Sequence, residues 1–315
     1  MVLFSIGALD VTAYGLCVMG AALAGLAMMA FFCRRDGQTR VMRVFAPLAA
    51  VLGFLGARLY YILSNGVLSG SFNLNLFSPY PFQYAMCGAI LGVTGACLLT
   101  ARLTGKSFGV LADAMAPAGL LTIAIERCGE VFSDFGWGVA MENGPMFFPL
   151  SVQDMYGQWH GAVFFLEAIC ALGVLSYVLH ERTNMPGESY VLALTIWSCA
   201  QVFCESLRAE TLRWGFVRVQ QLQCVIFALV ILAVYTRILL QKPYKKKGPA
   251  ELLCWVMFIE GVAVVALMEY AIDKWTLPVM LDYGIMIMAL CGMGAAVRLI
   301  VRRACRNENV PWKER

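Results

Sequence analysis

Arginines within or beside apolar stretches are the residues of this sequence best placed to do chemistry. Arg58, Arg127 and Arg208 lie in or at the end of such stretches. A guanidinium presents its N–H donors in a planar fork that matches the oxygens of a phosphate. A cation at membrane depth costs on the order of 3 kcal/mol unless it is paired or solvated. These positions therefore indicate either buried ion pairs or a site for an anionic headgroup.

Acidic side chains occur in the same parts of the sequence as these arginines. They are Glu126, Glu130, Asp134, Asp154, Glu205 and Glu210. One interpretation is structural, with ion pairs that lock the ends of helices. The other is functional, with arginine forks that hold the phosphate of an anionic lipid headgroup at the outer leaflet. The pattern alone leaves both interpretations open.

The composition indicates that these residues belong to a membrane protein. Of 315 residues, 60% are hydrophobic and 14% are charged, and the mean hydropathy is +0.72. A typical soluble domain has about 25% charged residues, so a soluble enzyme, a disordered chain and a secreted disulfide scaffold are disfavoured. Apolar runs long enough to span a bilayer predict an all-α, polytopic transmembrane bundle. The predicted spans lie near 14–33, 45–63, 85–104, 110–126, 161–180, 188–207, 220–241, 251–271 and 281–301.

The distribution of basic residues predicts the orientation. If the N-terminus is outside, the inside segments hold 18 of the 24 Lys and Arg. The positive-inside rule then predicts a multi-pass membrane protein with the N-terminus outside and the C-terminus cytoplasmic. The remaining six basic residues are Arg58, Arg127, Arg208, Arg213, Arg218 and Lys274. Because the charges gather at one face and no inverted repeat is visible, a transporter is disfavoured.

Metal and disulfide chemistry have little support in the sequence. The 12 cysteines form no CxxC pair, and most of them lie within apolar runs. The two histidines, His160 and His180, are too few for a multi-His metal site. We expect no metal, no cofactor and no nucleic-acid partner.

The order of motifs between residues 4 and 245 resembles the prolipoprotein diacylglyceryl transferase family of bacterial inner-membrane enzymes. Each fragment alone is weak, but together they follow the family's order along the chain. The matching fragments are Tyr14-Gly15-Leu16, Gly56-Ala57-Arg58-Leu59-Tyr60-Tyr61, Cys87-Gly88-Ala89-Ile90-Leu91-Gly92-Val93, Asp113 with Ala116-Pro117, Arg127 and Gly129 with Trp137-Gly138, Gln153-Asp154-Met155-Tyr156, Glu205-Ser206-Leu207-Arg208 and Val219-Gln220-Gln221.

The sequence departs from the family pattern at four polar positions. Cys87 stands where the family has a His, and Glu130 where it has an Asn. Phe135 aligns with a family Glu, although Asp134 is adjacent, and Gln201 replaces an Arg. These exchanges leave two hypotheses: an active transferase with a remodelled site, or an impaired relative that binds anionic phospholipid without turnover.

The resemblance implies transfer of a diacylglyceryl group from phosphatidylglycerol to the lipobox cysteine thiol of a prolipoprotein, at the outer leaflet. Glycerol phosphate leaves, and the thiol must lose its proton to attack. We expect Arg127, Glu130, Asp134 and Glu205 to be catalytic, and Tyr14, Arg58, Tyr61, Gly138, Tyr156 and Arg208 to bind substrate.

Alternatives remain open for several of these residues. Glu130 and Asp134 are both candidates for the base, and His160 is either a further candidate or an interfacial polar residue beside Trp159. The three tyrosines contact the headgroup or belong to an interfacial aromatic belt. Gly129, Gly136 and Gly138 are expected to let the backbone turn at the site.

The last two predicted spans lie outside the resemblance. We divide the chain into a transferase-like core of seven spans, residues 1–247, and a two-span extension of unknown role, residues 248–315. The basic run at 242–247 between them is either an anchor for anionic lipid or an ordinary cytoplasmic loop. The polar residues of the extension, Glu260, Glu269, Asp273 and Asp282, have no spacing that indicates chemistry.

Overall fold

The computed structural model describes residues 2–6, 9–35, 37, 39–72, 74–78, 83–133, 136–141, 144–181, 183–209, 211–214, 217–241, 249–274 and 278–306. In these ranges nine helices are long and apolar enough to cross a membrane, which confirms the predicted polytopic bundle. They are α1 (Ala13–Arg35), α2 (Thr39–Ser69), α3 (Met86–Thr104), α4 (Phe108–Gly129), α5 (Val163–His180), α6 (Glu188–Leu207), α7 (Val219–Leu240), α8 (Pro249–Lys274) and α9 (Val279–Cys305).

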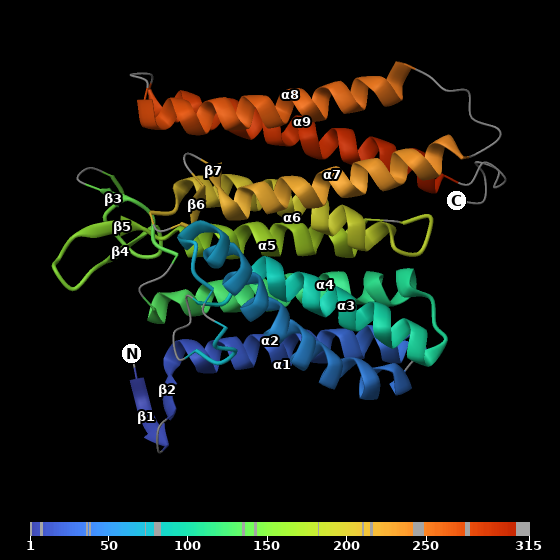
Figure 1. Cartoon of the computed structure of the whole chain (residues 1–315), viewed down its shortest axis with the longest axis horizontal. Coiled ribbons are helices and arrows are strands. Elements are labelled where there is room, and N and C mark those ends of the chain that lie inside the picture. Colours follow the sequence, from blue (N-terminus) through green and yellow to red (C-terminus); the bar gives the residue numbers. More distant parts are fainter. Residues whose placement is uncertain are drawn as a thin grey trace.

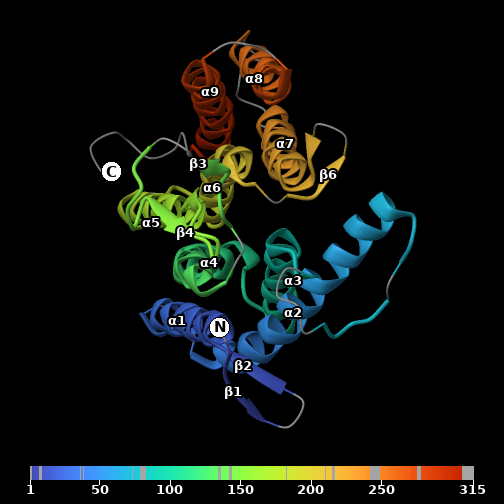
Figure 2. The same cartoon turned by 90° about the vertical axis from the view of Figure 1, so that its left-hand side faces the viewer.

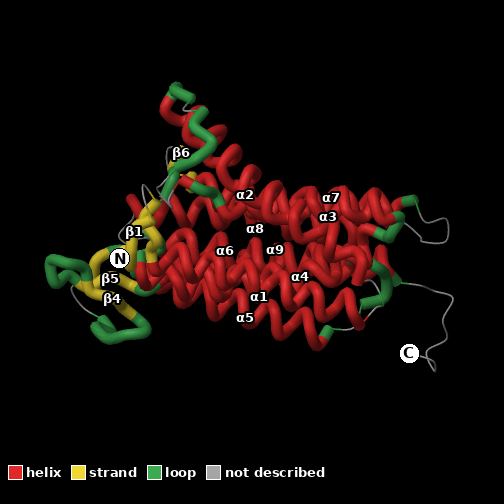
Figure 3. The backbone as a smooth tube through the Cα atoms, turned by 90° about the horizontal axis from the view of Figure 1, so that it is seen from below, coloured by secondary structure: helices red, strands yellow, loops and turns green. Residues whose placement is uncertain are grey.

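The helices run side by side along the long axis of the molecule (Figure 1). Their order across the bundle follows the chain closely, from α1 and α2 at one side to α8 and α9 at the other. Viewed from one end, the final turns of α2 lean away from the other helices (Figure 2), and the view from below shows the same divergence (Figure 3).

All the described strands lie at one end of the bundle, which we call the strand end (Figure 1). The opposite end is the loop end. The strands form the hairpin of β1 (Val2–Ile6) with β2 (Leu9–Thr12), the antiparallel sheet of β3 (Ala140–Met141), β5 (Trp159–Gly161) and β4 (Ser151–Gln153), and the pair of β6 (Arg213–Trp214) with β7 (Val217–Arg218). A short 3₁₀ helix, η2 (Glu130–Phe132), follows α4 at this end.

One helix is longer than the apolar pattern predicts. The predicted second span, 45–63, is only the apolar centre of α2, which covers Thr39–Ser69. Hydropathy detects the lipid-embedded part of a helix, whereas Arg40 and Arg43 extend this helix with polar turns.

Pro117 lies inside α4 without ending it. A proline is tolerated in such a helix where neighbouring helices cover the freed backbone carbonyl.

Glycines allow α2 and α3 to pack backbone against backbone. A Cβ atom on Gly88 would lie 2.3 Å from the Gly56 carbonyl oxygen, and one on Gly92 would lie 2.0 Å from the Leu52 carbonyl oxygen. Small residues at helix crossings permit this close approach in membranes. The glycines that carry part of the family resemblance therefore have a structural role here.

The two C-terminal helices belong to the same packed body as the core. Leu232 of α7, Phe258 of α8 and Met293 of α9 are fully buried in one apolar cluster. Helix α9 contacts both α6 and α7. The extension therefore packs against the helices that end closest to the candidate site.

Candidate active site

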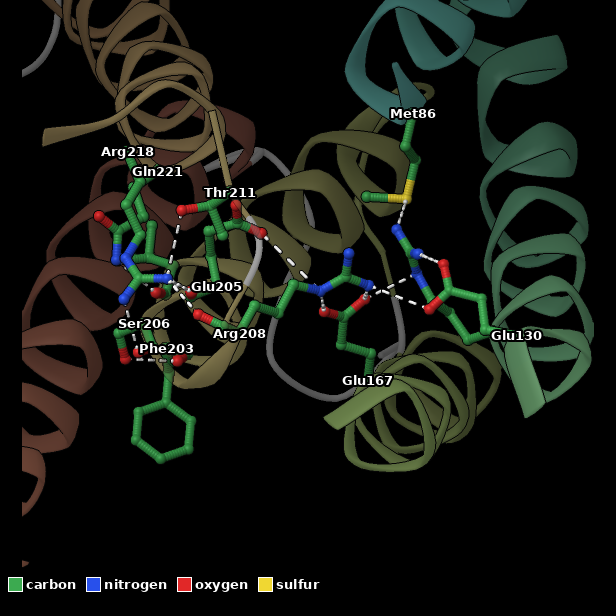
Figure 4. Close-up of polar contacts among 12 residues, drawn as sticks. Met86, Glu130, Glu167, Phe203, Glu205, Ser206, Arg208, Thr211, Arg218 and Gln221 are labelled. Carbon is green, nitrogen blue, oxygen red and sulfur yellow. Dashed lines mark hydrogen bonds and ion pairs between the residues drawn. The ribbon is translucent and has the colours of Figure 1, made fainter. Parts of the chain in front are cut away.

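Five helix termini and turns bring charged side chains together at the strand end. Arg127 lies in the last turn of α4, and Glu130 begins η2 directly after it. Glu167 lies one turn into α5. Glu205 lies in the last turn of α6, and Arg208 follows that helix. Figure 4 shows Glu130, Glu167, Glu205 and Arg208 turned toward one another from these separate elements.

Two arginines and two glutamates form a closed network, which we call the Arg–Glu ring (Arg127, Glu130, Glu167 and Arg208). The Glu167 carboxylate joins the arginines, with Oε2 lying 2.6 Å from Arg127 Nε and Oε1 lying 2.6 Å from Arg208 Nε. Glu130 accepts from Arg127 Nη1 through one oxygen, and its other oxygen lies 3.2 Å from Arg208 Nη2. Because every charge in the ring has an opposite partner, the network can exist at membrane depth.

Four further side chains extend the ring. Glu126 Oε2 lies 3.6 Å from Arg127 Nε, and the Tyr14 hydroxyl donates to Glu126 Oε1 over 2.6 Å. Glu205 Oε2 lies 3.9 Å from Arg208 Nε. Arg127 Nη2 donates to the Met86 thioether over 3.1 Å. A thioether is a weak acceptor, so a phosphate oxygen could displace it from this donor.

A third arginine, Arg218, is buried and contacts the end of α6 beside the ring. Arg218 Nη1 donates to the carbonyl oxygens of Glu205 at 2.6 Å and of Arg208 at 2.7 Å. Its Nη2 donates to the Ser206 carbonyl at 3.0 Å. Arg218 Nε lies 3.5 Å from Glu269 Oε2. These bonds add a donor to carbonyls at and just after the end of α6, where backbone acceptors lack the usual helical partners.

Gly136 lies where the backbone must turn beside Glu130. Its φ is +73°, and a Cβ atom there would lie 2.0 Å from Glu130 Oε2. The expected turning role therefore holds at Gly136 and is wrong for the other two glycines. Gly129 has a helical φ of −68°, and a Cβ there would lie 2.5 Å from Cys17 Cβ. Gly138 pairs with Arg208 in a β-bridge and donates to the Gly161 carbonyl at 2.7 Å.

A cavity of about 900 Å³ opens beside the Arg–Glu ring, between α1, α2, α3, α4, α6 and α7. Its polar end is lined by Tyr14, Glu126, Arg127, Glu130, Glu205 and Arg208. Mostly apolar side chains line the remainder as far as Met29 on α1, which is about 22 Å along that helix from Tyr14. A cavity charged at one end and apolar along its length fits an amphiphile with an anionic head and long tails.

Arg58 lies apart from this cavity lining. Its Nε donates to the Asn75 carbonyl over 2.8 Å, and its Nη1 donates to the Gln83 carbonyl and Oε1 over 3.0 Å each. Its guanidinium carbon lies 5.8 Å from the centre of the Tyr61 ring. Tyr61 itself lines the cavity. The substrate-binding assignment of Arg58 remains a prediction, and its observed contacts are with the α2–α3 connection.

Two other predicted residues lie away from the ring or outside the described residues. Tyr156 is 87% exposed, in the turn between β4 and β5. The backbone N–H groups of Gln158 and Tyr156 bond Asp154 in this turn, and these bonds lower the pKa of its carboxyl. Asp134, together with its neighbour Phe135, lies outside the described residues.

Three of the positions that depart from the family pattern, Cys87, Glu130 and Gln201, are buried. His160, the alternative base, has Nδ1 3.2 Å from the Gly138 carbonyl oxygen and Nε2 3.4 Å from Asp154 Oδ2. Cys87 and Gln201 are almost fully buried, in α3 and α6. Within the described chain, the Gln201 amide has no hydrogen-bond partner.

Sequence reasoning missed three residues of this site. Glu167 lies within an apolar run and has no role in the sequence analysis. A single acidic residue at membrane depth is nevertheless a signal of a buried partner. Arg218 was counted among the outer basic residues without a role. Glu269 was noted in the extension, but its partners Arg218 and Gln221 are 51 and 48 residues away in sequence. Only the folded chain brings them together.

The chain matches one protein family over most of its length. The sequence model of the family described as prolipoprotein diacylglyceryl transferase matches residues 1–237. The chain is 25% identical over 254 residues to the phosphatidylglycerol–prolipoprotein diacylglyceryl transferase of Listeria innocua, covering 77% of this chain and 92% of that protein. It is 28% identical over 240 residues to the enzyme of that name from Clostridium kluyveri, covering 73% and 92%. With the Bacillus velezensis enzyme of the same name it shares 26% identity over 249 residues, covering 73% and 88%.

Proposed function

The chain belongs to the prolipoprotein diacylglyceryl transferase family, and we propose that it transfers a diacylglyceryl group from phosphatidylglycerol to the lipobox cysteine thiol of a prolipoprotein. The observation that carries this proposal is the cavity of about 900 Å³ with the Arg–Glu ring at its end. Its apolar length suits two acyl chains, and its charged end suits the phosphate of the headgroup.

In the proposed reaction, the cysteine sulfur attacks the glyceryl carbon that carries the phosphate. A carbon–sulfur bond forms, the carbon–oxygen bond to the phosphate breaks, and glycerol phosphate leaves with the electron pair. The thiol proton passes to a carboxylate, because the thiolate is the nucleophile. The product is a thioether, so the atoms and charges balance without a cofactor.

Arg127 is the residue best placed to bind the phosphate. Its guanidinium lines the cavity, and its Nη2 donates to the weakly accepting Met86 sulfur. A phosphate oxygen at that position would gain a charge-assisted hydrogen bond that strengthens as negative charge builds on the leaving group. Arg208, held by Glu167 and Glu130, is the second cation available to it.

Glu130 and Glu205 are two of the described carboxylates that could accept the thiol proton. Both line the cavity, and both are almost fully buried. Asp134 remains a candidate from the sequence. Tyr14 and Tyr61 line the same cavity and could offer their hydroxyl groups to the glycerol headgroup.

We assign the strand end to the outer leaflet of a bacterial plasma membrane. The helix termini at the loop end carry Arg34, Arg35, Arg102, Arg237, Arg302 and Arg303 in their last turns. The positive-inside rule makes that end cytoplasmic and the N-terminus external. This orientation exposes the site to prolipoproteins after export. The transferase unit is residues 1–247, and the family match, which ends at residue 237, supports that boundary.

Purified full-length protein, phosphatidylglycerol and a synthetic lipobox peptide provide the test. Mass spectrometry should find a gain of one diacylglyceryl unit on the peptide cysteine. Arg127→Ala should abolish this gain, whereas Arg102→Ala, an exposed arginine in the last turn of α3, should leave it unchanged. Lipid binding without any gain would overturn the transferase proposal in favour of a non-catalytic phospholipid-binding relative.

A further inference from the structure

Arg218 fixes the end of α6 that carries two of the site residues. It donates to the carbonyls of Glu205, Ser206 and Arg208, all within 3.0 Å. The first and last of these belong to residues whose side chains line the cavity. The position of the Arg218 guanidinium therefore sets the position of this cavity wall.

A buried guanidinium needs an opposite charge to hold it in place. Arg218 is 7% exposed, and the carboxylate beside it in the described chain is Glu269 of α8, with Oε2 at 3.5 Å from Nε. The other Glu269 oxygen accepts from Gln221 Nε2 at 2.6 Å, and the same nitrogen donates to the Val202 carbonyl of α6 at 3.1 Å. Glu269 is thus held by Arg218 and by Gln221 of α7, and Gln221 in turn bonds the backbone of α6.

Glu269 comes from outside the part of the chain that matches the family. The match ends at residue 237, whereas α8 begins at Pro249. We propose that the two-helix extension completes the active site, with Glu269 as a positioning residue that holds Arg218 and through it Glu205 and Arg208. This inference rests on the proposed function, because the positions of Glu205 and Arg208 affect the rate only if these residues take part in the transfer reaction.

A second tie between the extension and the core provides an internal comparison. At the loop end, Arg302 of α9 contacts Glu181, and its Nε lies 3.2 Å from Glu188 Oε1. Glu188 begins α6, about 25 Å along the helix from Glu205. If the two ion pairs only anchored the extension, loss of either pair would have the same effect on transfer. If Glu269 positions the site, loss of its pair with Arg218 should reduce transfer more than loss of the pair between Arg302 and Glu188.

The test compares charge-removing variants of the full-length protein. Glu269→Gln should lower kcat for diacylglyceryl transfer about tenfold or more, with KM for phosphatidylglycerol changed less than about twofold, because small displacements of reacting groups cost rate. Glu269→Asp, which keeps the charge, should recover part of the loss. Glu260→Gln on the exposed face of α8 and Arg302→Gln at the loop end should keep the kcat of the unchanged protein.

Amide hydrogen exchange supplies a readout that does not require turnover. Glu269→Gln should speed exchange across 203–209, and Glu260→Gln should not. Unchanged exchange in Glu269→Gln, or unchanged kcat, overturns the positioning role, and so does an equal loss of kcat in Arg302→Gln. If the unchanged protein transfers nothing to the peptide, the proposed function fails, while the exchange measurement still decides whether Glu269 holds this segment.

Discussion

Glu167 is the more deeply buried of the two carboxylates that hold both arginines of the Arg–Glu ring. It is fully buried and lies 2.6 Å from a nitrogen of each arginine. Glu167→Gln keeps the shape of the side chain but removes its charge. Both guanidinium groups then lose part of their orientation, so kcat for transfer should fall about 10²-fold. Transfer rates at saturating phosphatidylglycerol measure this effect.

Glu188→Gln is the matched control for that variant. Glu188 is equally buried and also pairs with an arginine, Arg302, but it lies at the other end of α6. Its loss should lower the thermal midpoint in detergent and leave kcat within about twofold, since the site is about 25 Å away. A similar loss of kcat in both variants would show that the ring acts only through global stability.

Gly136 is the backbone position that leaves room for Glu130. Gly136→Ala adds a methyl group 2.0 Å from Glu130 Oε2 at a φ of +73°, where an L-residue costs about 1–2 kcal/mol. We expect Glu130 to move and kcat to fall at least tenfold. Gly157→Ala imposes a similar φ of +82° in the β4–β5 turn, where the nearest atom to a Cβ lies at 3.5 Å. It should reduce stability without a comparable loss of rate.

The arginines of the site could be predicted from the sequence, but their partners could not. Arg127 and Arg208 stood out because few charges lie in apolar stretches, and Glu130 and Glu205 are close to them in sequence. Glu167 is 41 residues from Arg208, and its apolar neighbours give no sign of what it faces. The same holds for Glu269, whose partners are Arg218 in β7 and Gln221 in α7. Pairing across helices depends on rotation and depth, which one sequence does not specify.

At the scale of the helices, the contact between α2 and α3 depends on glycine. Gly92→Ala would place a methyl group 2.0 Å from the Leu52 carbonyl oxygen, so the helices must separate. Overpacking of this kind costs about 1–3 kcal/mol. We therefore expect a lower thermal midpoint in detergent for Gly92→Ala. Gly95→Ala, on the same helix with nothing within 4 Å of the added atom, should keep the midpoint. Equal midpoints for both variants would contradict a packing role for Gly92.

Hydropathy predicted all nine helices because a bilayer allows few alternatives for an apolar run. It could not predict the polar ends of α2 or the small strands at the strand end. Those strands have two to five residues, too short for an alternating pattern to be recognised. They matter because β3–β5–β4 and the Gly138–Arg208 bridge join the α4, α5 and α6 termini that carry the ring. The elements closest to the chemistry were therefore the least predictable.

At the scale of the whole molecule, the arginines at the two ends of the bundle differ in their burial and in their partners. At the loop end the basic residues lie in the last turns of helices, and several of them, such as Arg34 and Arg35, are exposed. At the strand end Arg127 and Arg218 are buried with carboxylates, and the cavity begins beside them. The first pattern suits an anionic cytoplasmic surface, and the second suits a site that binds one anionic headgroup.

This asymmetry predicts the orientation of the protein, which protease sites inserted into the full-length chain can measure. A site inserted after Met146, between β3 and β4, should be cut in right-side-out vesicles. A site inserted after Gly105, in the exposed turn between α3 and α4, should be cut only in inverted vesicles. The reason is that translocation of the arginines at the loop end is disfavoured. Cleavage after Gly105 in right-side-out vesicles would place the site on the cytoplasmic side, where exported prolipoproteins could not reach it.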